Sequence, residues 1–176
     1  MLQTLSLAML PVLMIVAALN DVASLRIPNW LTGLTAALFF PMAFLTGMPL
    51  AEFGWHLLAG AILFFVGYGI FAVGFFGGGD AKLMAAAGLW FGTSQTMPFL
   101  IVTAMAGGAM AMAYGFWSIF VMMVDFHVSD KADGTPRSFV TRLKQTMPQL
   151  PYGLALAVGA IIVFPQTWWV HGKWLS

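Results

Sequence analysis

The sequence predicts an all-α membrane protein, built as a bundle of six transmembrane helices with both termini outside the cytoplasm. Two observations support this fold class. Hydrophobic residues make up 61% of the 176 residues and charged residues only 7%, whereas soluble domains are about 25% charged. The few charges also stand far apart, so that long apolar stretches lie between them. This composition excludes a soluble globule and a disordered chain.

The spacing of the charges predicts where each helix crosses the membrane. The thirteen charged residues leave uncharged stretches at 1–20, 27–51, 53–79, 83–124 and 145–172. A bilayer core about 30 Å thick needs about 20 helical residues, so four stretches fit one helix each. The stretch 83–124 would be about 63 Å long as a helix and fits two, with a turn at 92–98. The expected spans are 2–20, 30–47, 54–76, 80–93, 98–124 and 151–170.

The distribution of positive charge supports this number of spans. With six spans, the loops 21–29, 77–82 and 125–150 lie on one side and carry six of the seven Lys and Arg residues: Arg26, Lys82, Lys131, Arg137, Arg142 and Lys144. Only Lys173 lies on the other side. Because cytoplasmic loops are enriched in Lys and Arg, these three loops are expected in the cytoplasm. Five tryptophans fall near the expected span ends, as interfacial aromatic residues do: Trp30, Trp55, Trp90, Trp168 and Trp169.

Residue types that are absent or scattered exclude several kinds of site. The chain contains no cysteine, which excludes disulfides, thiol catalysis and cysteine-ligated metal centres. Its three histidines are far apart in the sequence, so no metal site and no cofactor are expected. Seven Lys and Arg residues against six Asp and Glu give no basic field, so nucleic acid is not an expected partner.

The sequence from Gly77 to Asp80, Gly-Gly-Gly-Asp, is the most distinctive local feature. Three glycines let another chain approach the backbone closely, and Asp80 begins the next expected helix. As a plain structural feature, Asp80 would be an N-cap at the membrane boundary. Asp21 ends the first expected span, and its plain alternative is an ordinary polar loop. Asp21 and Asp80 are notable as a pair, because the six-span topology puts both on the same membrane face at similar depth.

Two neighbouring carboxyl groups can hydrolyse a peptide bond without a metal ion. Close like charges do not both ionise readily, so the pair shares one proton. The ionised partner can deprotonate a water molecule while the protonated partner polarises the peptide carbonyl. Asp21 and Asp80 are therefore the candidate catalytic residues.

Four elements along the chain resemble the type IV prepilin peptidases, which are membrane aspartyl proteases with a Gly-x-Gly-Asp motif. They are Asp21 at the end of the first helix, 26–29 (Arg-Ile-Pro-Asn), 77–82 (Gly-Gly-Gly-Asp-Ala-Lys) and 151–155 (Pro-Tyr-Gly-Leu-Ala). Within this family the chain is similar to the short, peptidase-only form associated with Flp/Tad pili. The resemblance implies one transmembrane peptidase domain over 1–176, with Asp21 and Asp80 catalytic on the cytoplasmic side of the bacterial inner membrane.

The resemblance also implies a substrate and partners. The substrate would be a prepilin or pseudopilin, cut between its basic leader and its hydrophobic helix, and pilus assembly machinery and membrane lipid are further partners. Longer members carry a cytoplasmic domain with a cysteine tetrad and methylate the new terminus. This chain begins with a membrane span and lacks cysteine, so no methyltransferase activity is expected.

Six further residues are candidates for binding the substrate or shaping the site: Gly77, Gly78, Gly79, Lys82, Arg26 and Tyr152. For Lys82 and Arg26 the alternative is simple anchoring at the positive side of the membrane, and for Tyr152 it is packing at a helix start. Two other functions stay open. The aspartates could serve a small transporter or assembly subunit as a proton or ion site, or a protease that cleaves within membrane helices. Carboxylates at the membrane boundary favour cleavage beside the membrane.

Overall fold

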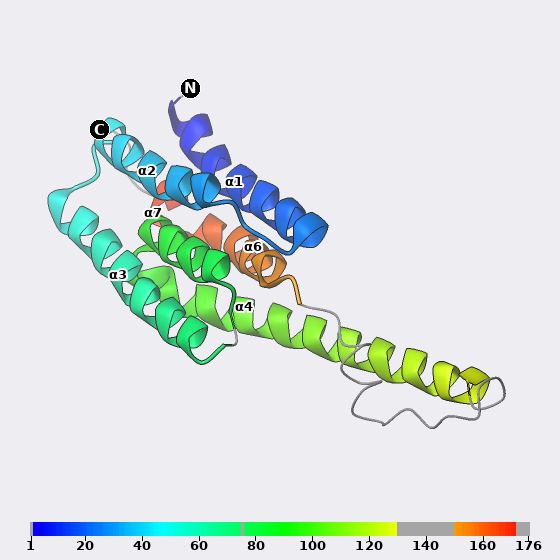
Figure 1. Cartoon of the computed structure of the whole chain (residues 1–176). Helices are drawn as coiled ribbons and strands as arrows, with labels where there is room; N and C mark the ends of the chain where they lie inside the picture. Colours follow the sequence, from blue (N-terminus) through cyan, green and yellow to red (C-terminus); the bar gives the residue numbers. More distant parts are fainter. Residues whose placement is uncertain (1, 75, 130–149, 172–176) are drawn as a thin grey trace. The chain divides into compact units, whose positions relative to one another are not determined.

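The computed structural model describes residues 2–74, 76–129 and 150–171, and the described residues form helices without strands. In chain order these are α1 (Leu2–Ser24), α2 (Asn29–Leu45), α3 (Leu50–Ala72), α4 (Gly78–Ser129), α6 (Tyr152–Val163), the 3₁₀ turn η1 (Phe164–Gln166) and α7 (Trp168–His171). Figure 1 shows them along the chain. The all-α prediction is confirmed.

Four helices are long and apolar enough to cross a membrane: Leu7–Ser24, Leu50–Ala72, Gly78–Val124 and Tyr152–His171. The helix Asn29–Leu45 is apolar but shorter. These findings agree with a multi-pass membrane protein. The number of six spans and the sides on which the termini and loops lie stay predictions, and most of the predicted cytoplasmic loop 125–150 lies outside the described residues.

The chain divides into two compact units. The first comprises 1–106 and 151–176, and the second comprises 107–150. In the second unit, the described residues continue α4 to Ser129. In the first unit, α1 packs along α6 and also contacts α2 and α7. The expectation of a single peptidase domain over 1–176 stays a prediction.

The first helix is longer than the sequence predicts. It continues past Asp21 to Ser24 and ends where Leu25 takes a positive φ of 52°. The amide of Leu25 still donates to the Asp21 carbonyl at 2.7 Å, as at a left-handed helix cap. Pro28 then takes an extended conformation and precedes α2. Leu25 thus turns the chain out of α1, and Ile27 in the linker is buried.

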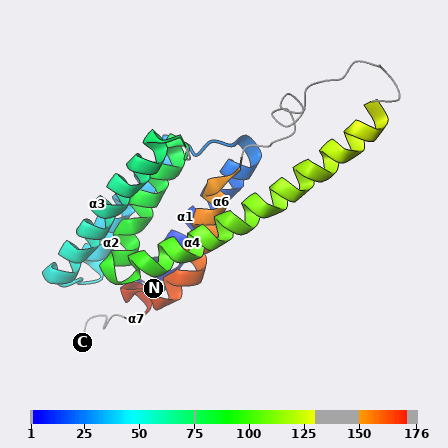
Figure 2. The ribbon, with the colours of Figure 1, turned by 90° about the horizontal axis from the view of Figure 1, so that it is seen from below.

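The expected turn at 92–98 is a single break at Gly92, where φ is 64° and ψ is 175°. The chain changes direction sharply there (Figure 2), and helical structure resumes directly and runs through Pro98. The rings of Phe91 and Phe99 stack with centroids 4.6 Å apart, which a straight helix would not allow across eight residues. A turn of seven residues is therefore wrong, because one glycine with positive φ is sufficient. We call 78–91 the first limb of α4.

Aromatic residues around this break form the centre of the core. Trp90 and Trp169 are fully buried inside the protein, whereas Trp30 and Trp55 are exposed. The position of these tryptophans relative to the membrane interface stays a prediction. The indole of Trp169 donates to the Trp90 carbonyl at 2.6 Å, and the indole of Trp90 donates to the Thr35 carbonyl at 2.9 Å. Both N–H groups have partners inside the protein, which makes full burial of these rings possible.

Candidate active site

Both candidate catalytic carboxyl groups are buried in the first unit. Asp21 is 4% exposed and Asp80 is 8% exposed. They belong to α1 and to the first turn of α4, which are 59 positions apart in sequence. Gly153, which contacts Asp21, and Gly79, which precedes Asp80, both pack against Ile27, so the two acids lie in the same region of the fold. The fold thus brings together the two acids that the sequence analysis paired.

Each carboxylate accepts a hydrogen bond from the backbone of a glycine. The amide of Gly153 donates to Asp21 Oδ2 at 2.6 Å, and the amide of Gly77 donates to Asp80 Oδ2 at 3.2 Å. Gly153 is in the first turn of α6, where amide groups have no partner within the helix. The chain therefore holds both acids through main-chain donors, whose positions depend little on side-chain rotamers.

One oxygen of the pair has no partner. Asp80 Oδ1 is buried and forms no hydrogen bond. An unpaired buried carboxyl oxygen costs free energy, about 1–3 kcal/mol or more for a charged group, and such atoms are rare in folded proteins. This atom is the place in the site that is chemically unsatisfied, as expected for a group that takes or gives a proton during a reaction.

The linker between α1 and α2 fills the space between the two acidic segments. A Cβ atom added to Gly79 would come within 3.0 Å of Ile27 Cβ and 3.1 Å of its carbonyl oxygen. A Cβ atom on Gly153 would come within 2.9 Å of Ile27 Cδ1 and 2.8 Å of Asp21 Oδ2. Ile27 therefore packs against both glycines at once, and it connects the Asp80 segment to the α6 segment that holds Asp21.

The structure gives the three consecutive glycines different surroundings. A Cβ on Gly77 would approach Asp80 Oδ2 at 3.0 Å, and Gly79 is packed against Ile27. On Gly78 a Cβ would make only ordinary contact with the ring edge of Phe71, at 3.6 Å. A Cβ on Gly79 would therefore crowd the side chain and backbone of Ile27, a Cβ on Gly77 would press on the Asp80 carboxyl group, and Gly78 has room for one.

The other candidate residues lie around the two acids. Tyr152 packs its ring against Phe76, with centroids 5.0 Å apart. The side chain of Arg26 is exposed. Lys82 donates to Asn29 Oδ1 at 2.8 Å. On a helix, residues 80 and 82 point about 200° apart, so Lys82 extends away from the side on which Asp80 lies.

Sequence reasoning gave no role to Ile27 and none to the amide of Gly153. Gly153 and Asp21 are 132 positions apart, and no local pattern connects them. The position of a glycine one residue into a helix that follows Pro151 was the available signal, since the free amides at helix starts bind carboxylates. Among the described residues, no group of three or more His, Cys, Asp or Glu could hold a metal ion.

Comparison with known proteins identifies the family of the chain. Neither a curated protein nor a solved structure matches the chain. The model of the type IV leader peptidase family matches residues 8–112, which include Asp21, the Ile27 linker and the three glycines before Asp80. Residues 8–112 are more than half of the chain, and this protein with two buried, amide-held aspartates belongs to the type IV leader peptidase family.

Proposed function

We propose that the protein is an aspartic endopeptidase of the bacterial inner membrane that removes the leader peptide from Flp-type prepilins at the cytoplasmic face. The observation that carries the proposal is the pair formed by Asp21 and Asp80. Both are buried, each accepts a backbone hydrogen bond from a glycine, and Asp80 keeps one buried oxygen without a partner. The proposal covers leader removal and not methylation of the new terminus.

The chemistry follows from the coupled carboxyl groups. A pair that shares one proton contains a base and an acid at the same time. The base takes a proton from a water molecule as its oxygen attacks the scissile carbonyl carbon, and the acid gives its proton to the carbonyl oxygen. When the tetrahedral intermediate breaks, the C–N bond opens and the leaving amine takes a proton from one carboxyl group. A hydroxyl group of the intermediate gives its proton to the other carboxylate as the new carbonyl forms. The pair returns to its starting state with one proton.

The position of the pair suits a bond at the membrane boundary. Asp21 is three positions before the last residue of α1, and Asp80 is in the first turn of α4. A prepilin helix stays in lipid, because withdrawing its apolar side chains would cost about 0.8 kcal/mol per CH₂ group. Only the residues before that helix need to reach the carboxyl groups. This geometry supports cleavage beside the membrane rather than within it.

A cleavage assay tests the proposal. The protein is expressed together with a candidate Flp-type pilin from the same genome, and the pilin mass is measured before and after. We expect loss of the basic leader, with no effect of metal chelators. If the pilin stays full length with the wild-type protein folded in the membrane, the proposed function is wrong, and a proton or ion site becomes the better explanation of the pair.

The topology has its own test. We expect reporter fusions after Lys144 to read cytoplasmic and fusions near Met48 or after Ser176 to read external. A cytoplasmic reading after Ser176 would contradict the six-span arrangement that places both aspartates on the cytoplasmic face.

A further inference from the structure

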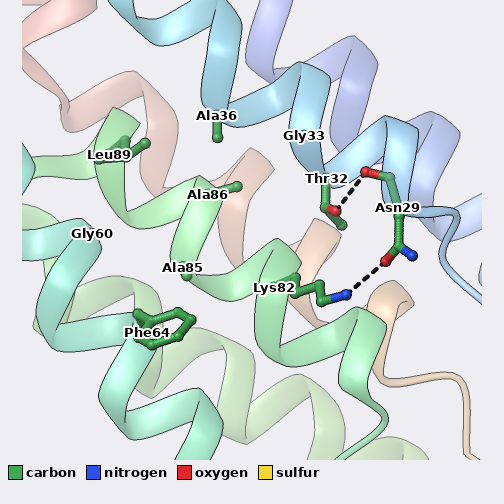
Figure 3. A pocket seen from close by; sticks show the side chains of 10 residues that line it. All are labelled: Asn29, Thr32, Gly33, Ala36, Gly60, Phe64, Lys82, Ala85, Ala86 and Leu89. Atoms are coloured by element: carbon green, nitrogen blue, oxygen red, sulfur yellow. Dashed lines mark hydrogen bonds between the residues drawn. The ribbon is translucent and has the colours of Figure 1, made fainter.

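A groove of about 390 Å³ runs between α2, α3 and the first limb of α4 (Figure 3). Four of its lining residues lie on one face of α2 and four on one face of α4, each set with the spacing i, i+3, i+4, i+7. Gly60 and Phe64 of α3 complete it. The lining residues are Asn29, Thr32, Gly33, Ala36, Gly60, Phe64, Lys82, Ala85, Ala86 and Leu89.

One end of the groove carries its polar groups. Lys82 Nζ donates to Asn29 Oδ1 at 2.8 Å, and Figure 3 shows these two side chains reaching toward each other. The ammonium group has two further N–H donors, and the Asn29 amide has two. None of the ten lining residues is acidic. This end of the groove, which we call the mouth, therefore presents donors and one positive charge.

The starts of two helices add to the positive potential at the mouth. Asn29 is the first residue of α2, and Lys82 lies in the second turn of α4, which begins at Gly78. The N-terminal end of a helix carries a partial positive charge, so both helix dipoles favour an anion here. The anion would need a single phosphate-sized group, since the mouth has one cation.

Beyond the mouth the groove is apolar and narrow. Its walls carry the small residues Gly33, Ala36, Ala85 and Ala86, and Leu89 lies at the far end. Seven residues of helix, from position 29 to 36 or from 82 to 89, extend about 10 Å. Thr32 is the polar lining residue between positions 29 and 36, and its hydroxyl donates to the Asn29 carbonyl, so the remaining small and apolar walls suit a flexible hydrocarbon chain.

We propose that this groove binds an anionic glycerophospholipid, with the phosphate at Lys82 and Asn29 and an acyl chain along the small-residue walls. The charge of the mouth selects the headgroup, and the apolar helices of a membrane protein place the groove in contact with lipid. The groove is separate from the aspartate pair, because Lys82 and Asp80 extend about 200° apart around α4. The proposal does not depend on the peptidase function.

Native mass spectrometry of the purified protein tests the headgroup preference. The protein is reconstituted with equal amounts of dioleoylphosphatidylglycerol and dioleoylphosphatidylcholine, transferred to detergent, and the retained lipids are counted. We expect phosphatidylglycerol to be retained in preference. Replacing Lys82 with Gln should lower the ratio of the two lipids about fivefold, the effect of one Lys near an anionic surface. Asp80→Asn should leave the ratio unchanged.

A second pair of variants tests the groove itself. Gly33→Leu places a larger apolar side chain at the groove, where an added Cβ meets nothing within 4 Å. Gly69→Leu is the matched control, since its Cβ is also in open space and Gly69 does not line the groove. We expect Gly33→Leu to lose most of the retained lipid and Gly69→Leu to keep it, with both proteins folded and monodisperse.

Three results would overturn the proposal. The first is equal retention of both lipids by the wild-type protein. The second is retention by Gly33→Leu at the wild-type level. The third is that Gly33→Leu keeps its lipid but fails to cleave a prepilin, which would assign the groove to the helix of the substrate instead of to a lipid. A failure of the wild-type protein to cleave any pilin would leave the lipid measurements unaffected.

Discussion

The hydrogen-bond acceptors at the two ends of the first limb of α4 are paired in different ways. At the end near Gly92 the helix is interrupted, and the carbonyls of Leu89 and Trp90 would accept from residues 93 and 94 in a continuous helix. Ring donors bind them instead: His56 Nδ1 at 2.6 Å from the Leu89 oxygen, and Trp169 Nε1 at 2.6 Å from the Trp90 oxygen. Because a carbonyl only accepts, Nδ1 of His56 carries the proton.

At the end near Asp80 the side chains act as acceptors, whereas at the Gly92 end the side chains act as donors. The two carboxyl groups at the Asp80 end accept from the backbone amides of Gly153 and Gly77, and Asp80 Oδ1 stays unpaired. Aromatic rings also enclose the Gly92 end, where His56 stacks on Phe39 with centroids 5.7 Å apart. The freed carbonyls at the Gly92 end are thus paired, although Gln95 Oε1 beyond the break is buried without a partner, whereas the unpaired oxygen at the other end belongs to a carboxyl group that can transfer a proton. Substitutions at the first end should change stability, and substitutions at the second should change catalysis.

The largest effect is expected from removing the charge of either aspartate. Asp21→Asn or Asp80→Asn should each lower the cleavage rate at least about 10³-fold, because neither variant retains both the acid and the base. The amount of protein in the membrane should stay near the wild-type level. Pulse-labelled prepilin, followed by gel shift, measures the rate.

Glu52→Gln is the control for this pair of substitutions. Glu52 is an exposed carboxylate in the first turn of α3, so its loss should leave cleavage unchanged. Processing near the wild-type rate by either aspartate variant would rule out the aspartyl mechanism.

Gly153→Ala is expected to have the next largest effect. Its Cβ would lie 2.8 Å from Asp21 Oδ2 and 2.9 Å from Ile27 Cδ1, so the carboxyl group must move. A displacement of about 1 Å in a catalytic group costs about 10²-fold in rate. We expect a loss of this size in activity per folded molecule.

A second glycine on α6 gives the comparison for Gly153. A Cβ on Gly159 would meet the side chain and backbone of Thr103, away from both aspartates. Gly159→Ala should therefore lower the yield of folded protein and leave the activity of each folded molecule unchanged. If the two alanine variants behave alike, the amide of Gly153 only supports packing.

Substitutions of the two glycines directly before Asp80 are expected to differ in their effects on activity. Gly79→Val should lower activity per folded molecule about tenfold, because the branched side chain would push Ile27 away from the pair. Gly78→Ala should be close to wild type, since its Cβ meets only the ring edge of Phe71. Activity and folded yield falling in parallel for Gly79→Val would show that Gly79 serves the turn alone.

The helices and the acidic pair could be predicted from the sequence, because uncharged stretches and membrane thickness are local quantities. The partners of those residues could not. Asp21 accepts a hydrogen bond from the amide of Gly153, which is 132 positions away in the sequence. Asp21 is itself part of α1, because that helix continues past residue 20. Trp90 and Trp169 fall near predicted span ends, and the sequence does not show that their indole groups donate to the Thr35 and Trp90 carbonyls inside the protein. Such pairings depend on tertiary packing, which the spacing of residue types does not encode.

The smallest effect on catalysis is expected at the Gly92 end. Trp169→Phe keeps an aromatic ring but removes the donor to the Trp90 carbonyl, which is held at 2.6 Å in a fully buried environment. An unpaired buried carbonyl costs about 1–3 kcal/mol, so the free energy of unfolding should fall by that amount. Thermal unfolding in detergent measures the loss, and Trp55→Phe, at an exposed tryptophan, is the matched control.

Cleavage per folded Trp169→Phe molecule should equal that of the wild type, because the aspartate pair is at the other end of the limb, about 18 Å away along twelve residues of helix. A strong fall in that activity would show that the two ends are coupled and that the structural end also sets the geometry of the carboxyl groups.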